Sequence, residues 1–139
     1  MQQEIRTMTI TDYDACIALW RQTEGMVLSD ADSRESITDY LARNPDSSFV
    51  YIFDEKIVGT VLCGHDSRRG YMYHVAVTPQ FRGKSIAKRL VISSLERLKL
   101  AGINKCHLMV LENNKIGNDF WTHSGWQLRS GILLYSSNT

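Results

Sequence analysis

The sequence predicts an α/β fold in which a mixed central sheet carries helices on both faces. Apolar residues recur with the period of a strand in some segments and with the period of a helix in others. The resulting order is one strand, two helices, three strands, a helix, a strand, a helix and a final strand. No linker, repeat or low-complexity tract interrupts the chain, so we expect a single domain over residues 1–139.

The first strand and the first helix are predicted close to the N-terminus. Residues 4–10 alternate loosely between polar and apolar side chains, as a half-buried strand does. Residues 11–22 place their apolar side chains on one helical face, with Thr11 as the expected N-cap and Gly25 as the stop.

A second, short helix follows. Asp32 and Glu35 have the spacing of a capping box, and the apolar residues behind them recur at helical intervals. This helix should end before Asn44 and Pro45, because the residue before a proline disfavours helical geometry.

Three strands come next and should form an antiparallel meander. Residues 49–53 and 57–63 are apolar runs separated by the polar turn 54–56, which predicts a hairpin. Residues 71–77 are rich in aromatic and β-branched side chains, and Thr78 and Pro79 stop that strand.

The C-terminal half predicts two helices and two strands. The longest helical pattern starts near Ala87 and ends at Gly102, and residues 105–111 form the next strand. That strand, helix and strand step should be a right-handed parallel crossover. Residues 115–123 then predict a short helix and residues 126–135 a final strand.

Composition narrows the classes of partner and location. Sixteen basic against fifteen acidic residues leave a net charge of +1, which gives no reason to expect nucleic acid. The chain has neither an apolar N-terminal region nor an 18-residue apolar run, so secretion and membrane contact are not expected. Three scattered cysteines favour a reducing, cytoplasmic location, and no Cys or His pair has zinc-site spacing, so we expect no metal.

The segment 75–87 carries the clearest chemical signal, because a strand there turns directly into a long helix. Such a junction exposes backbone N–H groups and the positive end of the helix dipole, which suits a pyrophosphate. Gly83 would allow close backbone approach, and Arg82 and Lys84 add charge. A tight turn with two solvated basic residues explains the same spacing equally well.

Gly83-Lys84-Ser85 also has the form of the end of a P-loop. The first glycine of a P-loop would fall on Thr78, however, and Pro79 and Phe81 stiffen the loop. A nucleotide triphosphatase is therefore rejected.

The same segment resembles motif A of the GCN5-related N-acetyltransferases, the GNAT family. A hydrophobic-Ala-Val-x-Pro strand is followed by (Gln/Arg)-x-x-Gly-x-(Gly/Ala), and the matching residues are Gln80, Arg82 and Gly83, continued by Ile86, Ala87 and Leu90. The C-terminal part is similar to that family's Asn-x-x-Ala, aromatic and Gly-aromatic motif, at Asn114, Phe120, Trp121, Gly125 and Trp126. The element order agrees, so the resemblance covers essentially the whole chain.

The sequence departs from the family pattern at three positions. Ser85 stands where Gly or Ala is usual, and Gly117 replaces an Ala. Trp121 takes the place of the tyrosine that protonates the leaving thiolate in many members. An indole N–H can donate a hydrogen bond but cannot practically give up its proton, so a general acid at Trp121 is in doubt.

The resemblance implies acetyl-CoA as co-substrate and a cleft where the strand 71–77 separates from the strand 105–111. Peptide groups of Val75 and Val77 would bind the pantetheine arm, and the Val75 N–H could polarise the thioester carbonyl. The expected coenzyme-binding residues are Val75, Ala76, Val77, Arg82, Gly83, Lys84, Ser85, Ile86, Ala87 and Asn114.

The candidates for proton transfer are Tyr71 and Tyr73, on one face of their strand, with Trp121 beside the sulfur. Both tyrosines could instead pack as cross-strand aromatics. By strand alternation His74 should face the other way, as a satisfied core histidine. Glu24 could reach the amine or be a solvated carboxylate.

The function expected is direct transfer of an acetyl group to a primary amine of a small molecule or peptide. The alternative is a non-catalytic acyl-CoA-binding or sensing domain, and a third is an interaction module without coenzyme. The loop 65–70 fits either a hairpin turn or the substrate mouth. The final strand, 126–135, could pair across a homodimer.

Overall fold

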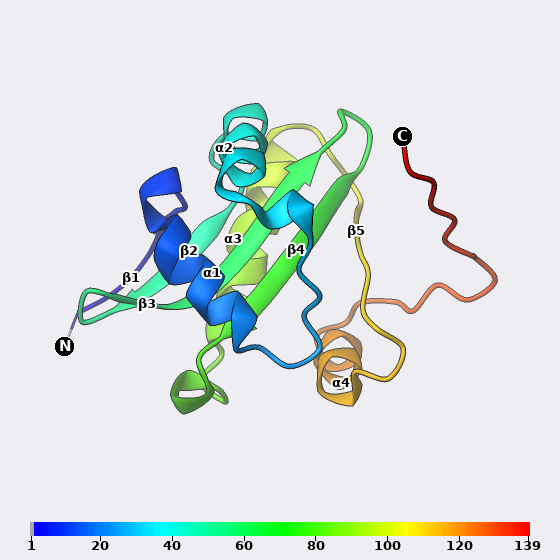
Figure 1. The fold of residues 1–139 in the computed structure, drawn as a ribbon. Helices are drawn as coiled ribbons and strands as arrows, with labels where there is room; N and C mark the ends of the chain where they lie inside the picture. Colours follow the sequence, from blue (N-terminus) through cyan, green and yellow to red (C-terminus); the bar gives the residue numbers. More distant parts are fainter. Residues whose placement is uncertain (1) are drawn as a thin grey trace. The chain divides into compact units, whose positions relative to one another are not determined.

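The computed structural model describes residues 2–139 and divides into two compact units, one ending at Met109 and the other running Val110–Thr139. The elements, drawn in Figure 1, are β1 (Gln3–Thr7), η1 (Ile10–Asp12), α1 (Tyr13–Arg21), η2 (Asp30–Asp32), α2 (Arg34–Arg43), β2 (Phe49–Phe53), β3 (Lys56–His65), β4 (Gly70–Val77), η3 (Pro79–Phe81), α3 (Ile86–Leu100), β5 (Cys106–Leu108) and α4 (Lys115–His123). The elements labelled η are single turns of 3₁₀ helix.

The first unit contains one five-stranded sheet in the order β1-β2-β3-β4-β5. Its first four strands pair antiparallel, and β5 pairs with β4 in parallel. The predicted meander and the predicted mixed sheet are both confirmed. The hairpin turn also lies where it was expected, with Asp54 and Glu55 at positive φ.

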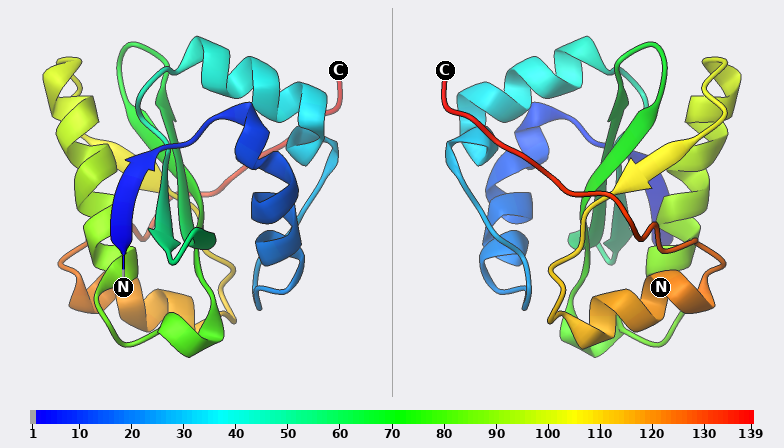
Figure 2. Two further views of the ribbon diagram at one scale, coloured as in Figure 1. Left: turned by 90° about the vertical axis from the view of Figure 1, so that its left-hand side faces the viewer. Right: turned by 90° about the vertical axis from the view of Figure 1, so that its right-hand side faces the viewer.

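Helices cover both faces of this sheet, as predicted (Figure 2). On one face, Trp20 of α1 and Ile37 of α2 pack into a core with Leu62 and Ala76 of the sheet. On the other face, α3 lies against β3 and β4. Its close approach depends on a missing side chain, because a Cβ on Gly70 would lie 2.5 Å from a methyl carbon of Leu98.

The starts of the first two helices differ from the prediction. Thr9, not Thr11, closes the first capping box, with Asp12 as its third residue. Asp32 does not begin α2: it closes a second capping box with Ser29 around η2, and Ser33 caps α2. A short 3₁₀ turn precedes each helix, η1 before α1 and η2 before α2. Several polar residues near each start could therefore have been the N-cap, and the sequence did not distinguish them.

The strand β5 is shorter than predicted, since it covers only Cys106–Leu108. No helix among the described residues has the length and apolar character needed to cross a membrane.

The second unit contains α4, whose bounds Lys115–His123 agree with the prediction. The predicted strand over residues 126–135 was wrong, because residues 126–139 form no helix or strand. Apolar side chains there, including Leu133 and Tyr135, are exposed. An alternating pattern makes a strand only where a neighbouring backbone accepts its hydrogen bonds, and this segment has no such ladder in the part of the chain described.

Candidate functional site

The loop after β4 gives the backbone an open, left-handed path into α3. Gly83 has φ +77°, and a Cβ built on it would meet no described atom within 4 Å. Ser85, the N-cap of α3, is also left-handed, with φ +64°. This conformation favours glycine, which is one of the two residues usual at this position in the GNAT pattern.

The N-terminus of α3 has free donors. Its first intrahelical bond runs from the Arg89 N–H to the Ser85 carbonyl, at 3.1 Å. The N–H groups of Ile86, Ala87 and Lys88 precede that bond, and no described side chain caps this end of the helix. The donors and the helix dipole make this terminus attractive to an anion.

Two basic residues flank these donors. Arg82 donates from Nε to the carbonyl oxygen of Val77 at 3.0 Å, and its Nη1 lies 3.4 Å from a carboxylate oxygen of Glu24. Lys84 is exposed, with its ammonium 5.5 Å from the centre of the Phe81 ring. Neither side chain fills the space in front of Gly83.

The edge of β4 that faces β5 is paired along only part of its length. The ladder runs through Gly70, Tyr71 and Met72 and then ends. Because the Thr78 N–H donates to Val58 of β3, alternation directs the N–H groups of Val77 and Val75 to the opposite, unpaired edge. The ladder between β4 and β5 therefore ends at Met72 and Leu108, where β5 itself ends.

Ala76 differs from its two neighbours. It pairs with Thr60 of β3, and its methyl group is buried in the core under α1. The backbone N–H groups of Val75 and Val77 thus face the unpaired edge of β4, whereas the side chain of Ala76 packs into the core.

Tyr71 and Tyr73 lie on the face of the sheet covered by α1 and α2. Tyr73 is 39% exposed and meets Tyr40 of α2 edge-on, with ring centres 6.4 Å apart. The ring of Tyr71 lies 5.8 Å from that of His107. Partial burial, with the nearby Tyr71, raises the pKa of Tyr73, so its phenol stays protonated at neutral pH.

The prediction for His74 was half wrong. The pairing of β3 with β4 shifts register between Thr60 and Leu62, and His74 has φ +52° in the resulting bulge. Simple alternation therefore fails, and His74 lies on the same face as Tyr73, against Trp20. It is a satisfied histidine, as expected, since its Nε2 lies 2.6 Å from Oδ1 of Asp32.

The loop 65–70 is explained by its own hydrogen bonds. Asp66 Oδ1 accepts the N–H groups of Arg68 and Arg69, each at 2.8 Å. Those two bonds lower the pKa of this exposed carboxyl. The side chain of Arg69 bonds Asn104 at 3.2 Å, so Asp66 and Arg69 both have structural partners.

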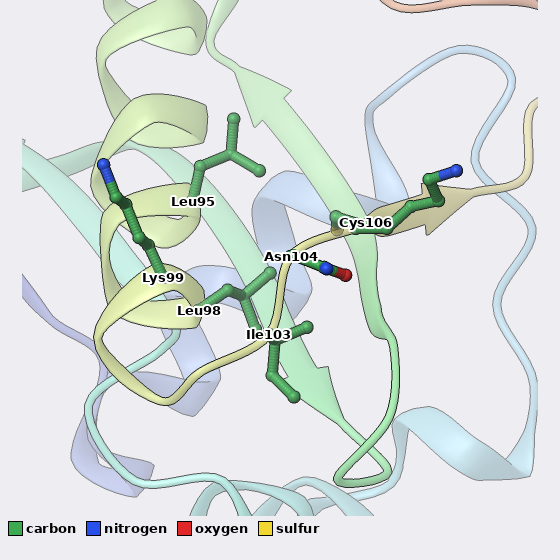
Figure 3. Close-up of a pocket in the computed structure, with 7 residues that line it drawn as sticks. Leu95, Leu98, Lys99, Ile103, Asn104 and Cys106 are labelled. Carbon is green, nitrogen blue, oxygen red and sulfur yellow. The ribbon is translucent and has the colours of Figure 1, made fainter.

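A separate pocket of about 310 Å³ lies at the C-terminal end of α3 (Figure 3). Gly83 precedes the other end of this helix. Leu95, Leu98 and Cys106 line it together with the connecting segment to β5. It belongs to the α3 face of the sheet and not to the face of Tyr71 and Tyr73. Among residues 2–139, no cluster of His, Cys, Asp and Glu side chains could hold a metal ion.

In the second unit, Asn114 and Trp121 have local structural contacts. The Asn114 side chain caps α4 by accepting the Gly117 N–H at 3.0 Å. A Cβ at Gly117 would lie 2.6 Å from Nδ2 of Asn114, so the departure from the usual Ala leaves room for this cap. The Trp121 ring packs edge-on against Phe120 at 4.9 Å and Trp126 at 4.8 Å.

Sequence reasoning missed the bulge in β4 and its partner Asp32. The sequence carries no glycine at the bulge, so alternation appeared unbroken there. The available signal was weak: histidine is one of the few non-glycine residues enriched at positive φ.

Comparison with known proteins decides the family. The model of the acetyltransferase (GNAT) family matches residues 13–126. The chain belongs to the GNAT family. An acetyltransferase of Pectobacterium atrosepticum is 36% identical over 111 residues, which cover 80% of this chain and 78% of that protein. An acetyltransferase of Sodalis glossinidius is 28% identical over 131 residues, covering 94% and 92%.

Solved structures agree with the GNAT fold. The PaiA N-acetyltransferase of Thermoplasma acidophilum, in complex with coenzyme A, matches with a TM-score of 0.79 at 20% identity, covering 93% of this chain and 92% of that one. An aminoglycoside N-acetyltransferase in complex with CoA matches with a TM-score of 0.80 at 17% identity, covering 99% and 96%. At these identities the likeness concerns the fold.

Proposed function

We propose that this GNAT acetyltransferase transfers the acetyl group of acetyl-CoA directly to a primary amine of a small molecule or peptide. One observation carries the proposal most strongly. After Met72 the edge of β4 that faces β5 has no pairing strand, and the chain then leads through a loop to the uncapped N-terminus of α3. An exposed strand edge suits an amide-bearing pantetheine arm, and the helix end suits its pyrophosphate. Family membership supports the same reading.

The residues of the loop fit a pyrophosphate chemically. Gly83 leaves open space for close approach, and the N–H groups of Ile86 and Ala87 are free to donate. The hydroxyl of Ser85 and the charges of Arg82 and Lys84 surround this position, and all three residues are exposed. In the second unit, Asn114 remains proposed as a coenzyme-binding residue on the strength of the family motif alone.

The backbone of β4 would hold the acyl arm. Val77 and Val75 each direct an N–H to the unpaired edge, the latter for the thioester carbonyl, while the Val77 carbonyl accepts Arg82 Nε. A fixed N–H aimed at that oxygen stabilises the charge that develops as an amine attacks. Acetyl-CoA, when bound, would supply the acetyl group, and coenzyme A would leave as its thiolate when the bond between carbonyl carbon and sulfur breaks.

Proton transfer would pass through water held by Tyr71 and Tyr73. The attacking amine is protonated near pH 7 and must lose a proton first. The raised pKa of Tyr73 makes it a donor and holder of water, not a base. In the second unit, Trp121 remains proposed as an N–H donor on the strength of the family motif alone, and its indole would not give up a proton.

The state of the cysteines supports direct transfer, without an acyl-enzyme. Burial raises the pKa of Cys16 to about 12, and hydrogen bonding to Cys106 with burial raises that of Cys63. The pKa of Cys106 is lowered, but it lines the pocket beside α3 on the other face of the sheet from the tyrosines. Neither buried thiol can act as a nucleophile.

The second candidate function is an acyl-CoA-binding or sensing domain without turnover. The observation in its favour is Trp121, which stands where many relatives have an acid. Both functions require the same coenzyme site and differ only in chemistry.

A binding test and a turnover test separate the candidates. Acetyl-CoA should raise the melting temperature, since a ligand that binds only the folded state stabilises it. An unchanged melting temperature would instead indicate an interaction module. Release of free thiol with at least one member of a panel of amines, amino acids and peptides would support the enzyme, whereas stabilisation without release would favour the sensor.

We also infer that both units form one catalytic domain over residues 1–139, because the matching family model spans 13–126. Three free cysteines support a cytoplasmic location. The strand expected to pair across a homodimer is absent from the described structure. The remaining support for a homodimer is the exposed apolar side chains of residues 126–135. Light scattering would measure it.

A further inference from the structure

The bulge at His74 reverses which edge of β4 the backbone groups face. The Gly70 N–H donates toward β5, to the Lys105 carbonyl at 2.9 Å. The Thr78 N–H donates toward β3, to Val58 at 2.8 Å. Eight residues separate them, so an unbroken strand would direct both to the same edge. One extra residue in the strand accounts for the reversal.

This reversal places the Val75 N–H at the unpaired edge. Tyr73 pairs with Leu62 before the bulge, and Ala76 pairs with Thr60 after it. Counted from Tyr73 without a bulge, the Val75 N–H would point at β3 and be used in the ladder. The bulge is therefore what makes this donor available.

The conformation of His74 has to be held by its surroundings. A φ of +52° is unfavourable for a residue with a side chain, and such residues persist where contacts enforce them. The His74 carbonyl accepts the Thr60 hydroxyl at 2.9 Å, and that hydroxyl accepts the Trp20 N–H, also at 2.9 Å. Thr60 is fully buried, so this contact is shielded from water.

Whereas Thr60 bonds the backbone carbonyl of His74, Asp32 bonds its imidazole ring. Its Nε2 lies 2.6 Å from Oδ1 of Asp32, and both side chains are nearly buried, at 13% and 10% exposure. Asp32 is itself fixed, because its other oxygen accepts the Ser29 N–H at 3.0 Å and its carbonyl accepts the Tyr13 hydroxyl at 2.5 Å. The bulge is thus tied to the segment between α1 and α2.

We propose that the contact between His74 and Asp32 is a positioning element that maintains the bulge and so keeps the Val75 N–H aimed at the thioester carbonyl. The inference rests on the proposed function, since it assigns a role in polarising acetyl-CoA. His74 acts through the backbone of Val75 and does not touch the reacting atoms.

The test measures the carbonyl stretch of acetyl-CoA labelled with ¹³C at the carbonyl, which needs no acceptor amine. In the wild-type protein the stretch should move to lower frequency on binding. His74→Gly, which accepts the positive φ but lacks the ring, should bind acetyl-CoA within about threefold of wild type and lose most of this shift. His74→Gln, which keeps an N–H donor for Asp32, should recover part of it.

The matched control is Arg6→Gln. Arg6 binds Asp12 at 2.8 Å, and Asp12 closes the same kind of capping box as Asp32, but its carboxylate accepts from Arg6 and the Thr9 N–H and has no bond to His74. Arg6→Gln should lower stability and leave the carbonyl shift unchanged. Two outcomes would overturn this inference without touching the proposed function. One is a folded His74→Gly protein that shifts the acetyl-CoA carbonyl stretch as much as wild type does, and the other is wild-type protein that binds acetyl-CoA without shifting that stretch.

A second measurement needs no variant. The Val75 amide resonance of wild-type protein should move downfield with acetyl-CoA relative to coenzyme A, because only the former offers the carbonyl acceptor. An unchanged resonance would contradict the inference. Wild-type protein that fails to bind acetyl-CoA would overturn the proposed function and this inference together.

Discussion

Arg82 donates a hydrogen bond from Nε to the carbonyl oxygen of Val77 at 3.0 Å. The guanidinium therefore ties the end of β4 to the loop that precedes α3. The same side chain lies 3.4 Å from Glu24, on the segment after α1. Arg82 thus connects the end of β4, the loop before α3 and the segment after α1.

Arg82→Ala should weaken binding of acetyl-CoA, and more strongly at low salt than at high salt. The side chain is 37% exposed, so its attraction to a phosphate is screened by ions. The measurement is the dissociation constant at two ionic strengths. Arg34→Ala, which removes an exposed arginine paired with Asp14, is the control and should have no effect. A salt-independent loss would point to misfolding.

Gly83→Asp should abolish coenzyme binding, because it puts a side chain and a negative charge where the phosphates would lie. Its φ of +77° adds a backbone cost of about 1–2 kcal/mol. Gly102→Asp has nearly the same cost, at φ +82° with open space around it, but lies beyond the far end of α3. Normal affinity in folded Gly83→Asp protein would refute the site.

Much of the architecture was predictable because it depends on local pattern. The hairpin with its turn at Asp54 and Glu55, the bounds of α4 and the direct passage from β4 through a turn into α3 all follow from alternation, turn residues and caps. The separation of β4 from β5 was expected only through the family resemblance, and the structure shows a parallel ladder of three residue pairs that ends at Met72 and Leu108.

The failures share a physical cause. The bulge at His74 is held by Asp32 and Thr60, which are 42 and 14 residues away in sequence, so no local pattern encodes it. The missing strand over 126–135 has the composition of a strand but no ladder partner in the described structure. Both depend on tertiary contacts.

The three thiols should differ in reactivity with iodoacetamide at pH 8. Cys16 is fully buried with a pKa of about 12, and the pKa of Cys63 is raised, so neither supplies thiolate. The hydrogen bond from Cys63 lowers the pKa of half-buried Cys106, which should be alkylated first in native protein. Mass spectrometry identifies the site. Cys106→Ser should retain acetyl transfer; its loss would contradict direct transfer.

Asp12 should stabilise the fold above about pH 4 and less below it. Burial raises the pKa of this carboxyl, but hydrogen bonds from Arg6 and the Thr9 N–H outweigh it and bring the pKa below the usual 3.8. A lowered folded-state pKa gives stability that is present above 3.8 and lost as pH falls through the lowered value. Urea unfolding should find Asp12→Asn about 1–3 kcal/mol less stable at pH 7. A difference that persists at the lowest pH would argue against this linkage.

Trp121→Tyr should leave kcat unchanged or lower it, with little effect on coenzyme affinity. A thiol of pKa near 8.5 is already a fair leaving group in water, so no acid is required. The smaller ring would also loosen the packing against Phe120 and Trp126. Steady-state kinetics with an active amine provide the test. A rise of about tenfold or more, equal to about 1.4 kcal/mol of barrier, would show that an acid is needed there.

The central claim, acetyl transfer from acetyl-CoA to an amine, is tested most directly by following the label from [¹³C]acetyl-CoA into product by mass spectrometry. Purified wild-type protein should form a labelled N-acetyl product with at least one amine of a broad panel, and Gly83→Asp should form none. Tight binding of acetyl-CoA by the wild type without labelled product from any amine would contradict the claim and indicate a sensing domain.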